Sequence, residues 1–144
     1  MAAGEHIAAF IPHTGTMCLL ERIEHWDDSS VTVATTTHRN PTHPLASPSG
    51  LRAIHLCEYG AQAMALHGGL AAHARGEHAR PGLLVSLRDV TLGCDFVQDL
   101  EGELLVEARR LHDSGTVWQY EFRVTHDARL LAQGRATVSV ATRA

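Results

Sequence analysis

The chain has few cysteines, fewer basic than acidic residues and no long hydrophobic run. Cys18, Cys57 and Cys94 are too few and too scattered for a disulfide framework, so we expect reduced, buried thiols in a cytoplasmic protein. The formal net charge of −4 argues against nucleic-acid binding, which needs a basic surface. No apolar run approaches the ~18 residues of a membrane span, and the first residues lack the basic stretch of a signal peptide. We therefore expect neither a nucleic-acid partner nor a membrane.

Among the residues that are present, histidine is unusually frequent, with 11 in 144 positions. Most of these histidines have structural explanations. His73 and His78 lie in a polar connector, and His112 and His126 stand beside turn-forming residues. The spacings Cys-x-x-Cys and His-Glu-x-x-His, which are typical of zinc sites, do not occur. We therefore predict no metal ion and no cofactor.

Alternating and β-branched segments predict a sheet. The pattern is clearest from Trp118 to Val124, where apolar side chains alternate with polar ones. Short turn-forming sequences separate the last three segments and predict hairpins. The segment MCLLERIEHW fits either a helix or a strand, and its place before a β-rich segment favours a strand. The predicted strands are 17–26, 30–37, 82–92, 103–111, 117–125 and 129–143.

One long helix is predicted, from about Leu51 to Ala74. Its second half is rich in Ala and Gly on all sides, which is typical of a buried helix that packs closely against a sheet. Gly68 and Gly69 each cost roughly 1 kcal/mol of helix propensity relative to Ala, so we expect a packing reason for them. Two strands, one long helix and four strands predict an α+β fold, a mostly antiparallel curved sheet wrapped round one central helix. The chain is expected to form one domain, 1–144.

A polar stripe interrupts the apolar surface of this predicted helix. His55 and Glu58 are three residues apart and Gln62 follows four residues later, so the three share one face. A buried carboxylate is costly unless it is paired or protonated. A protonated carboxyl in such a place can act as a general acid. The structural alternative is that Glu58 only satisfies partners at a domain or subunit interface.

Two other segments carry candidate histidines. His13 lies in a Pro-His-Thr-Gly turn that leads into the first strand, where it could also cap the turn or sit at the edge of the core. His38 and His43 lie in the Pro- and Ser-rich loop before the helix. Loops held by a rigid scaffold often carry function, so this loop is a third candidate segment.

These segments resemble those of the hot-dog-fold 3-hydroxyacyl-acyl-carrier-protein dehydratases. More closely, the chain is similar to the divergent branch found in aryl-polyene and xanthomonadin-type pigment clusters. The resemblance covers nearly the whole chain. It rests on the opening IPHTGTMCLLERI, with Glu21 where Asp is usual, on the helix sequence CEYGAQAMALHGG, and on the late segments LEGELLVEARRL and RLLAQGRATVSV.

The resemblance implies dehydration of a 3-hydroxyacyl thioester to a 2-enoyl thioester. In the family, a histidine removes a proton from C2 and a helix carboxyl protonates the departing 3-hydroxyl. Backbone N–H groups at the helix start polarise the thioester carbonyl. Carried over to this chain, Glu58 matches the carboxyl, and Tyr59 and Gln62 beside it are expected to bind substrate. The family's Gly-His-Phe-Pro-Gly-His-Pro loop is absent, so the candidate bases are His13, His43 and His55.

The resemblance also implies partners. The substrate is expected to be linked to an acyl carrier protein or to CoA, and the chain is expected to form a homodimer or a heterodimer with another hot-dog chain. Because carrier proteins are acidic, a basic patch is predicted from Arg39, Arg80, Arg88, Arg109 and Arg110. The alternative functions are a non-catalytic partner subunit of a dehydratase, and an acyl thioesterase that uses Glu58.

Overall fold

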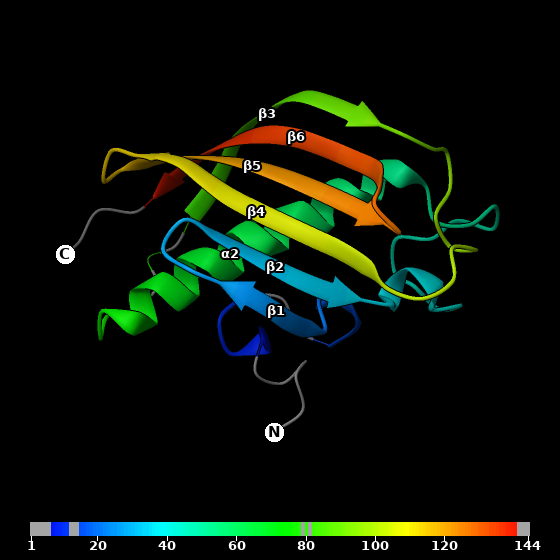
Figure 1. Cartoon of the computed structure of the whole chain (residues 1–144), viewed down its shortest axis with the longest axis horizontal. Coiled ribbons are helices and arrows are strands. Elements are labelled where there is room, and N and C mark those ends of the chain that lie inside the picture. Colours follow the sequence, from blue (N-terminus) through cyan, green and yellow to red (C-terminus); the bar gives the residue numbers. More distant parts are fainter. Residues whose placement is uncertain (1–6, 12–14, 79, 81, 141–144) are drawn as a thin grey trace.

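The computed structural model describes residues 7–11, 15–78, 80 and 82–140 of the chain. It contains one six-stranded antiparallel sheet with the strand order β1-β2-β4-β5-β6-β3, and one long helix, α2 (Figure 1). The elements are β1 (Arg22–Trp26), β2 (Ser30–Thr35), α2 (Leu56–Ala74), β3 (Gly82–Leu92), β4 (Leu104–Asp113), β5 (Val117–His126) and β6 (Arg129–Val140). Short 3₁₀ turns occupy Gly15–Met17, Thr37–Arg39 and Ala53–His55.

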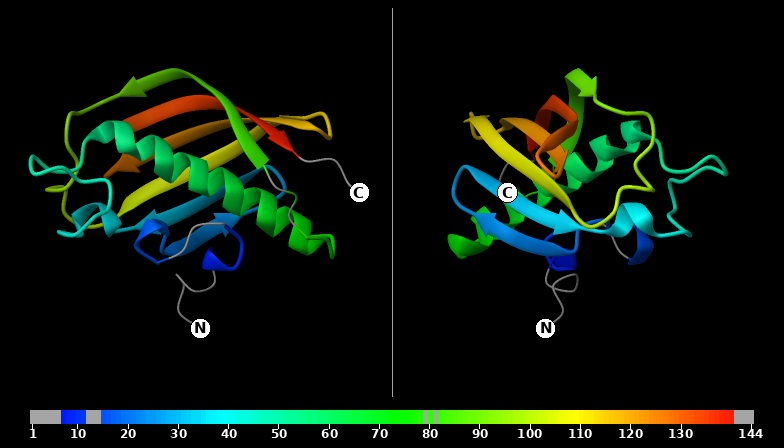
Figure 2. Two further views of the ribbon diagram at one scale, coloured as in Figure 1. Left: turned by 180° about the vertical axis from the view of Figure 1, so that it is seen from behind. Right: turned by 45° about the vertical axis from the view of Figure 1, so that its right-hand side comes forward.

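The helix lies along the concave face of the sheet, as the view from behind in Figure 2 shows. Its 19 residues extend over roughly 28 Å, enough to cross the whole sheet. Thirteen of them are buried, so the helix forms the centre of the core. The predicted fold, a mostly antiparallel curved sheet wrapped round one long helix, is confirmed.

The predicted alternation of apolar and polar residues is present in β5 and determines which of its side chains face the helix. Trp118, Tyr120, Phe122 and Val124 are buried against the helix. Phe122 stands opposite Gly134 in the neighbouring strand β6, and its ring fills the space that a side chain there would occupy. The row of large side chains on β5 thus explains why the residues packed against it are small.

Three predicted boundaries need correction, and the first is the strand predicted over 30–37, since β2 ends at Thr35 and Thr37–Arg39 form a 3₁₀ turn. The helix begins at Leu56 rather than Leu51, because the backbone before it pairs in extended form with the segment after β3. Within 17–26 only β1, Arg22–Trp26, is a strand. The strand predicted to end at residue 143 is described as far as Val140, and its last predicted residues lie outside the described ranges.

The three cysteines are free, as expected, but half-buried rather than buried.

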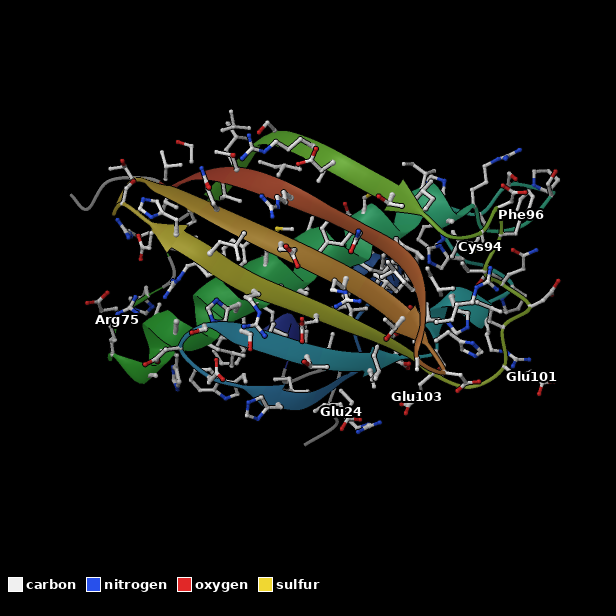
Figure 3. All side chains as sticks on the ribbon, turned by 45° about the horizontal axis from the view of Figure 1, so that its top comes forward. Glu24, Arg75, Cys94, Phe96, Glu101 and Glu103 are labelled. Atoms are coloured by element: carbon white, nitrogen blue, oxygen red, sulfur yellow. The ribbon has the colours of Figure 1, made fainter. Side chains whose placement is uncertain are left out.

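The two edges of the sheet differ in character. At β1 the edge carries Arg22, which bonds Glu24 and Glu103, and the strand is interrupted by a bulge after Ile23 (Figure 3 labels both glutamates). Charges and bulges are the usual protection of an edge strand. At β3 the edge is 11 residues long and exposed throughout, and six of its large apolar side chains are solvent-accessible. They are Leu83, Leu84, Val85, Leu87, Val90 and Leu92.

No helix among the described residues has the length and hydrophobicity to span a membrane.

The close packing of α2 on β5 predicts the effect of enlarging Gly60. A Cβ at this position would lie 2.5 Å from Cγ of Phe122. We expect Gly60→Ala to lower the free energy of unfolding by about 1–3 kcal/mol, because overpacking outweighs the gain in helix propensity. Ala61→Gly, at the half-buried next position, is the control and should cost about 1 kcal/mol by propensity alone. A raised melting temperature for Gly60→Ala would contradict this packing.

Candidate active site

The side chain of Gln62 holds the polar stripe of the helix together. Its Nε2 donates to Oε1 of Glu58 at 3.2 Å and to the carbonyl of Met17 at 2.7 Å. Its Oε1 accepts a hydrogen bond from the backbone N–H of Leu19 at 2.9 Å. Gln62 is fully buried, whereas Glu58, one turn earlier in the first turn of α2, is half-buried. One amide therefore fixes both the carboxylate and the segment that precedes β1.

His43 and Tyr59 form a hydrogen-bond chain beside this clamp. Nδ1 of His43 accepts from the N–H of Leu45 at 3.0 Å, so the proton of the neutral ring lies on Nε2, which donates to Oη of Tyr59 at 3.0 Å. Tyr59 in turn bonds Thr37, whose hydroxyl donates to the carbonyl of Leu19. Burial raises the pKa of Tyr59 to about 12, so its hydroxyl stays a donor. The chain binds the loop before the helix to the helix itself.

The hydrogen bonds of His43 make it a poor candidate for the base. His43 is buried and both of its ring nitrogens are engaged, so it has no free lone pair with which to accept a proton. Its pKa is lowered by burial first, and then by the charges of His55 and His38. His43 therefore acts as a support for Tyr59.

His38, a histidine of the same loop that is not among the predicted bases, is completely buried. Its Nε2 donates to the carbonyl of Leu100 at 2.7 Å, while Nδ1 has no hydrogen-bond partner among the described residues. Burial lowers its pKa. The only sequence signal for His38 is its place in the same loop as His43. Its burial comes from contacts with a segment about sixty residues away, which local sequence patterns do not show.

The other two predicted bases have different positions. His55 ends the 3₁₀ turn just before α2 and is half-buried, close enough to His43 for its charge to lower the pKa of that ring. His13 lies outside the described residues. No group of three His, Cys, Asp or Glu side chains that could hold a metal ion occurs in the part of the chain that the structure describes.

A separate buried histidine, His67, lies about one and a half helical turns beyond Gln62. Its Nε2 donates to the carbonyl of Asp27 at 3.0 Å, so Nδ1 accepts from Oη of Tyr120 at 2.7 Å. Arg110 bonds the same hydroxyl and the carbonyl of Asp28. Since each polar group is satisfied within the chain, this cluster joins the helix to the loop between β1 and β2 and offers no reactive atom.

The arginines predicted to form a basic patch do not gather in one place. Arg80 and Arg110 both stack on the ring of Trp118, which covers Gly68 in the second half of the helix. The other three, Arg39, Arg88 and Arg109, lie in a 3₁₀ turn, on β3 and on β4. The structure therefore gives no support for a patch made of these five residues.

A curved antiparallel sheet wrapped round one long helix is the hot-dog fold. The family model described as ApeP-like, ApeP dehydratase, matches residues 5–144. The chain therefore belongs to the ApeP-like dehydratase family.

Solved structures share its fold at low sequence identity. A chain of the dehydratase heterocomplex ApeI:P from Xenorhabdus doucetiae superposes with a TM-score of 0.83 at 23% identity, over 95% of this chain and 91% of that one. AziG from S. sahachiroi gives 0.64 at 17%, over 93% and 99%. A hypothetical thioesterase with coenzyme A from Streptococcus pneumoniae gives 0.60 at 15%, over 85% and 86%. No curated protein matches the sequence.

The three buried histidines predict acid lability. Burial lowers the pKa of His38, His43 and His67, so the folded chain favours neutral rings and the unfolded chain binds more protons below about pH 6.5. We expect the free energy of unfolding to fall between pH 7 and pH 5, by up to about 1.4 kcal/mol per pH unit for each ring.

Urea denaturation at pH 7, 6 and 5 measures this slope. His67→Gln keeps an acceptor for Tyr120 and a donor for Asp27, so it should reduce the slope while retaining the fold. His112→Gln, which removes an exposed histidine of β4, is the control for the loss of a ring that is not buried. Stability independent of pH over this range would contradict the buried neutral rings.

Proposed function

We propose that the chain removes water from 3-hydroxyacyl thioesters to give 2-enoyl thioesters, with Glu58 as the general acid. The observation that carries this proposal is the half-buried carboxylate in the first turn of a buried helix, fixed by Gln62, in a member of a dehydratase family. A fixed and partly accessible carboxyl meets the geometric requirement for proton transfer to a bound substrate. The thioester is linked to an acyl carrier protein or to CoA.

The reaction balances with one base and one acid. An imidazole takes the proton from C2, and the electron pair of that C–H bond forms the second C2–C3 bond. The C3–O bond breaks, and protonated Glu58 gives its proton to the departing hydroxyl, which leaves as water. Negative charge that develops on the thioester oxygen is favoured near the N-terminus of α2, where the helix dipole is positive.

Of the three candidate bases, His43 is the least suited to proton abstraction. The ring nitrogens of His43 are occupied by Leu45 and Tyr59, so a positioning role suits it better than proton abstraction. His55, one helical turn before Glu58, and His13 are the remaining candidates. Tyr59 uses its hydroxyl within the chain, so its contribution to substrate binding is to hold the loop in place.

A second hot-dog chain, identical or different, is the partner that we infer for β3. This edge is long, apolar and exposed along its whole length, and an unprotected edge of this kind is a template for pairing with another chain. The superposed Xenorhabdus doucetiae chain comes from a dehydratase heterocomplex, which supports a partnership of two chains here. A cytoplasmic location and a single domain over 1–144 stay predictions.

Glu58→Gln tests the acid role. The amide cannot donate a proton, so the formation of 2-enoyl product should fall by about 10²–10⁴-fold while the melting temperature stays unchanged. Glu107→Gln, at a half-buried position of β4 between two buried residues of the inner face, is the control and should retain activity. His55→Ala and His13→Ala, assayed in parallel, identify the base as the variant with a comparable loss.

The same assay separates the alternatives. It is run with the chain alone and with a second hot-dog chain, and it records 2-enoyl product and free thiol separately. Free thiol without enoyl product would establish a thioesterase. Activity that needs the second chain and is unaffected by Glu58→Gln would establish a non-catalytic subunit and contradict the acid role.

A further inference from the structure

The arginine at the entrance to the long helix is held by the backbone on both sides. Arg52 pairs with Phe96 in an isolated antiparallel bridge. The N–H of Ala53 donates to the carbonyl of Asp95 at 2.8 Å, and the carbonyl of Leu51 accepts from Val97 at 3.0 Å. The position of Arg52 relative to the helix is therefore fixed by the fold.

The side chain of Arg52 is exposed but oriented. Its Cζ lies 4.9 Å from the centroid of the Phe96 ring, a cation–π distance. A guanidinium stacked in this way keeps its N–H groups in the plane and free to donate in a bidentate manner. Arg22, Arg75 and Arg135 each form an ion pair with a glutamate, whereas Arg52 forms none with any described carboxylate. It is a preorganised cation without an acidic partner in this part of the chain.

Arg52 lies at the end of the molecule that carries Glu58. Figure 3 shows its stacking partner Phe96 at one end and Arg75, just beyond the end of α2, at the other. Along the 3₁₀ turn and the first turn of the helix, Arg52 and Glu58 are separated by roughly 10 Å. The connection that carries Phe96 is also bonded at its start, where Nη2 of Arg129 donates to the carbonyl of Gly93 at 2.7 Å.

The surface around Arg52 is not broadly basic. Asp95 and Asp99 lie in the same connection between β3 and β4, and would repel an acidic protein face laid across it. One small, strongly charged anion that reaches a single guanidinium fits this distribution better. Arginine is well suited to such a group, because its fork of N–H donors matches the oxygens of a phosphate.

We propose that Arg52 binds the phosphate of the pantetheine arm that carries the thioester substrate. The inference rests on the proposed function, because it places the thioester at Glu58. The arm has about thirteen bonds between the thioester sulfur and the phosphorus, a little over four residue-lengths of chain or about 14–16 Å when extended, so a thioester at Glu58 places the phosphate within reach of the long Arg52 side chain. CoA and a carrier protein present the same phosphate ester on the same arm.

Binding measurements test the site independently of catalysis. Titration calorimetry compares pantetheine 4′-phosphate with pantetheine on the intact chain. The wild type should bind the phosphorylated form roughly 10-fold or more tightly. Arg52→Ala should abolish this preference, and Arg52→Lys should keep part of it. Phe96→Leu, which removes the stacking platform, should weaken it. Arg39→Ala, an arginine of the nearby loop, is the matched control and should leave it unchanged.

Two results would overturn the proposal: equal affinity of the wild type for the two ligands, or an unchanged preference in Arg52→Ala. Because Arg52 is exposed, its variants should keep the melting temperature of the wild type.

Kinetics with three thioesters identify the source of the phosphate. Arg52→Ala should raise KM roughly 10-fold for the CoA or the carrier-protein substrate, or for both, and leave KM unchanged for an N-acetylcysteamine thioester, which has no phosphate. If KM rises for only the CoA substrate or only the carrier-protein substrate, that substrate is the one whose phosphate Arg52 contacts. An equal effect on all three contradicts a phosphate contact. If the wild type dehydrates none of them, the proposed function fails, whereas the binding ratio still decides the role of Arg52.

Discussion

The buried amide of Gln62 is the contact on which the site depends. It lies inside an apolar core, where an unpaired amide would cost about 1–3 kcal/mol for each lost hydrogen bond. Three partners satisfy it: the carboxylate of Glu58, the carbonyl of Met17 and the N–H of Leu19. The segment before β1 is therefore bound to the helix at the turn that bears Glu58, and the carbonyl of the same residue, Leu19, accepts from Thr37 at the end of the His43–Tyr59–Thr37 chain.

The rest of the architecture serves this central helix. Glycines let α2 approach the large side chains of β5, so the part of the helix from which Glu58 and Gln62 project is packed closely on the sheet. The sheet that surrounds it is protected by charge at β1 and unprotected at β3. Glu58 is thus held by contacts within one chain, while the β3 edge is left uncovered in this chain.

Local sequence patterns predicted most of the fold and only part of the site. Alternation identified β5, and a run of small residues identified α2, because both signals are carried by neighbours in sequence. The start of the helix was misplaced because Arg52 pairs with Phe96, a residue far along the chain. The pairing of His43 with Tyr59 is likewise a tertiary contact. Glu58 and Gln62 were found together because four residues along a helix bring them to one face.

The most direct test of the account is the requirement for a proton on the leaving group. The rates of wild type and Glu58→Gln are compared on a 3-hydroxyacyl thioester and on the 3-fluoroacyl thioester of the same length. Fluoride is the anion of a much stronger acid than water and departs with far less need for proton transfer. If Glu58 is the acid, the loss caused by Glu58→Gln should be large for the hydroxy substrate and small for the fluoro substrate. An equal loss for both would contradict the role assigned to Glu58.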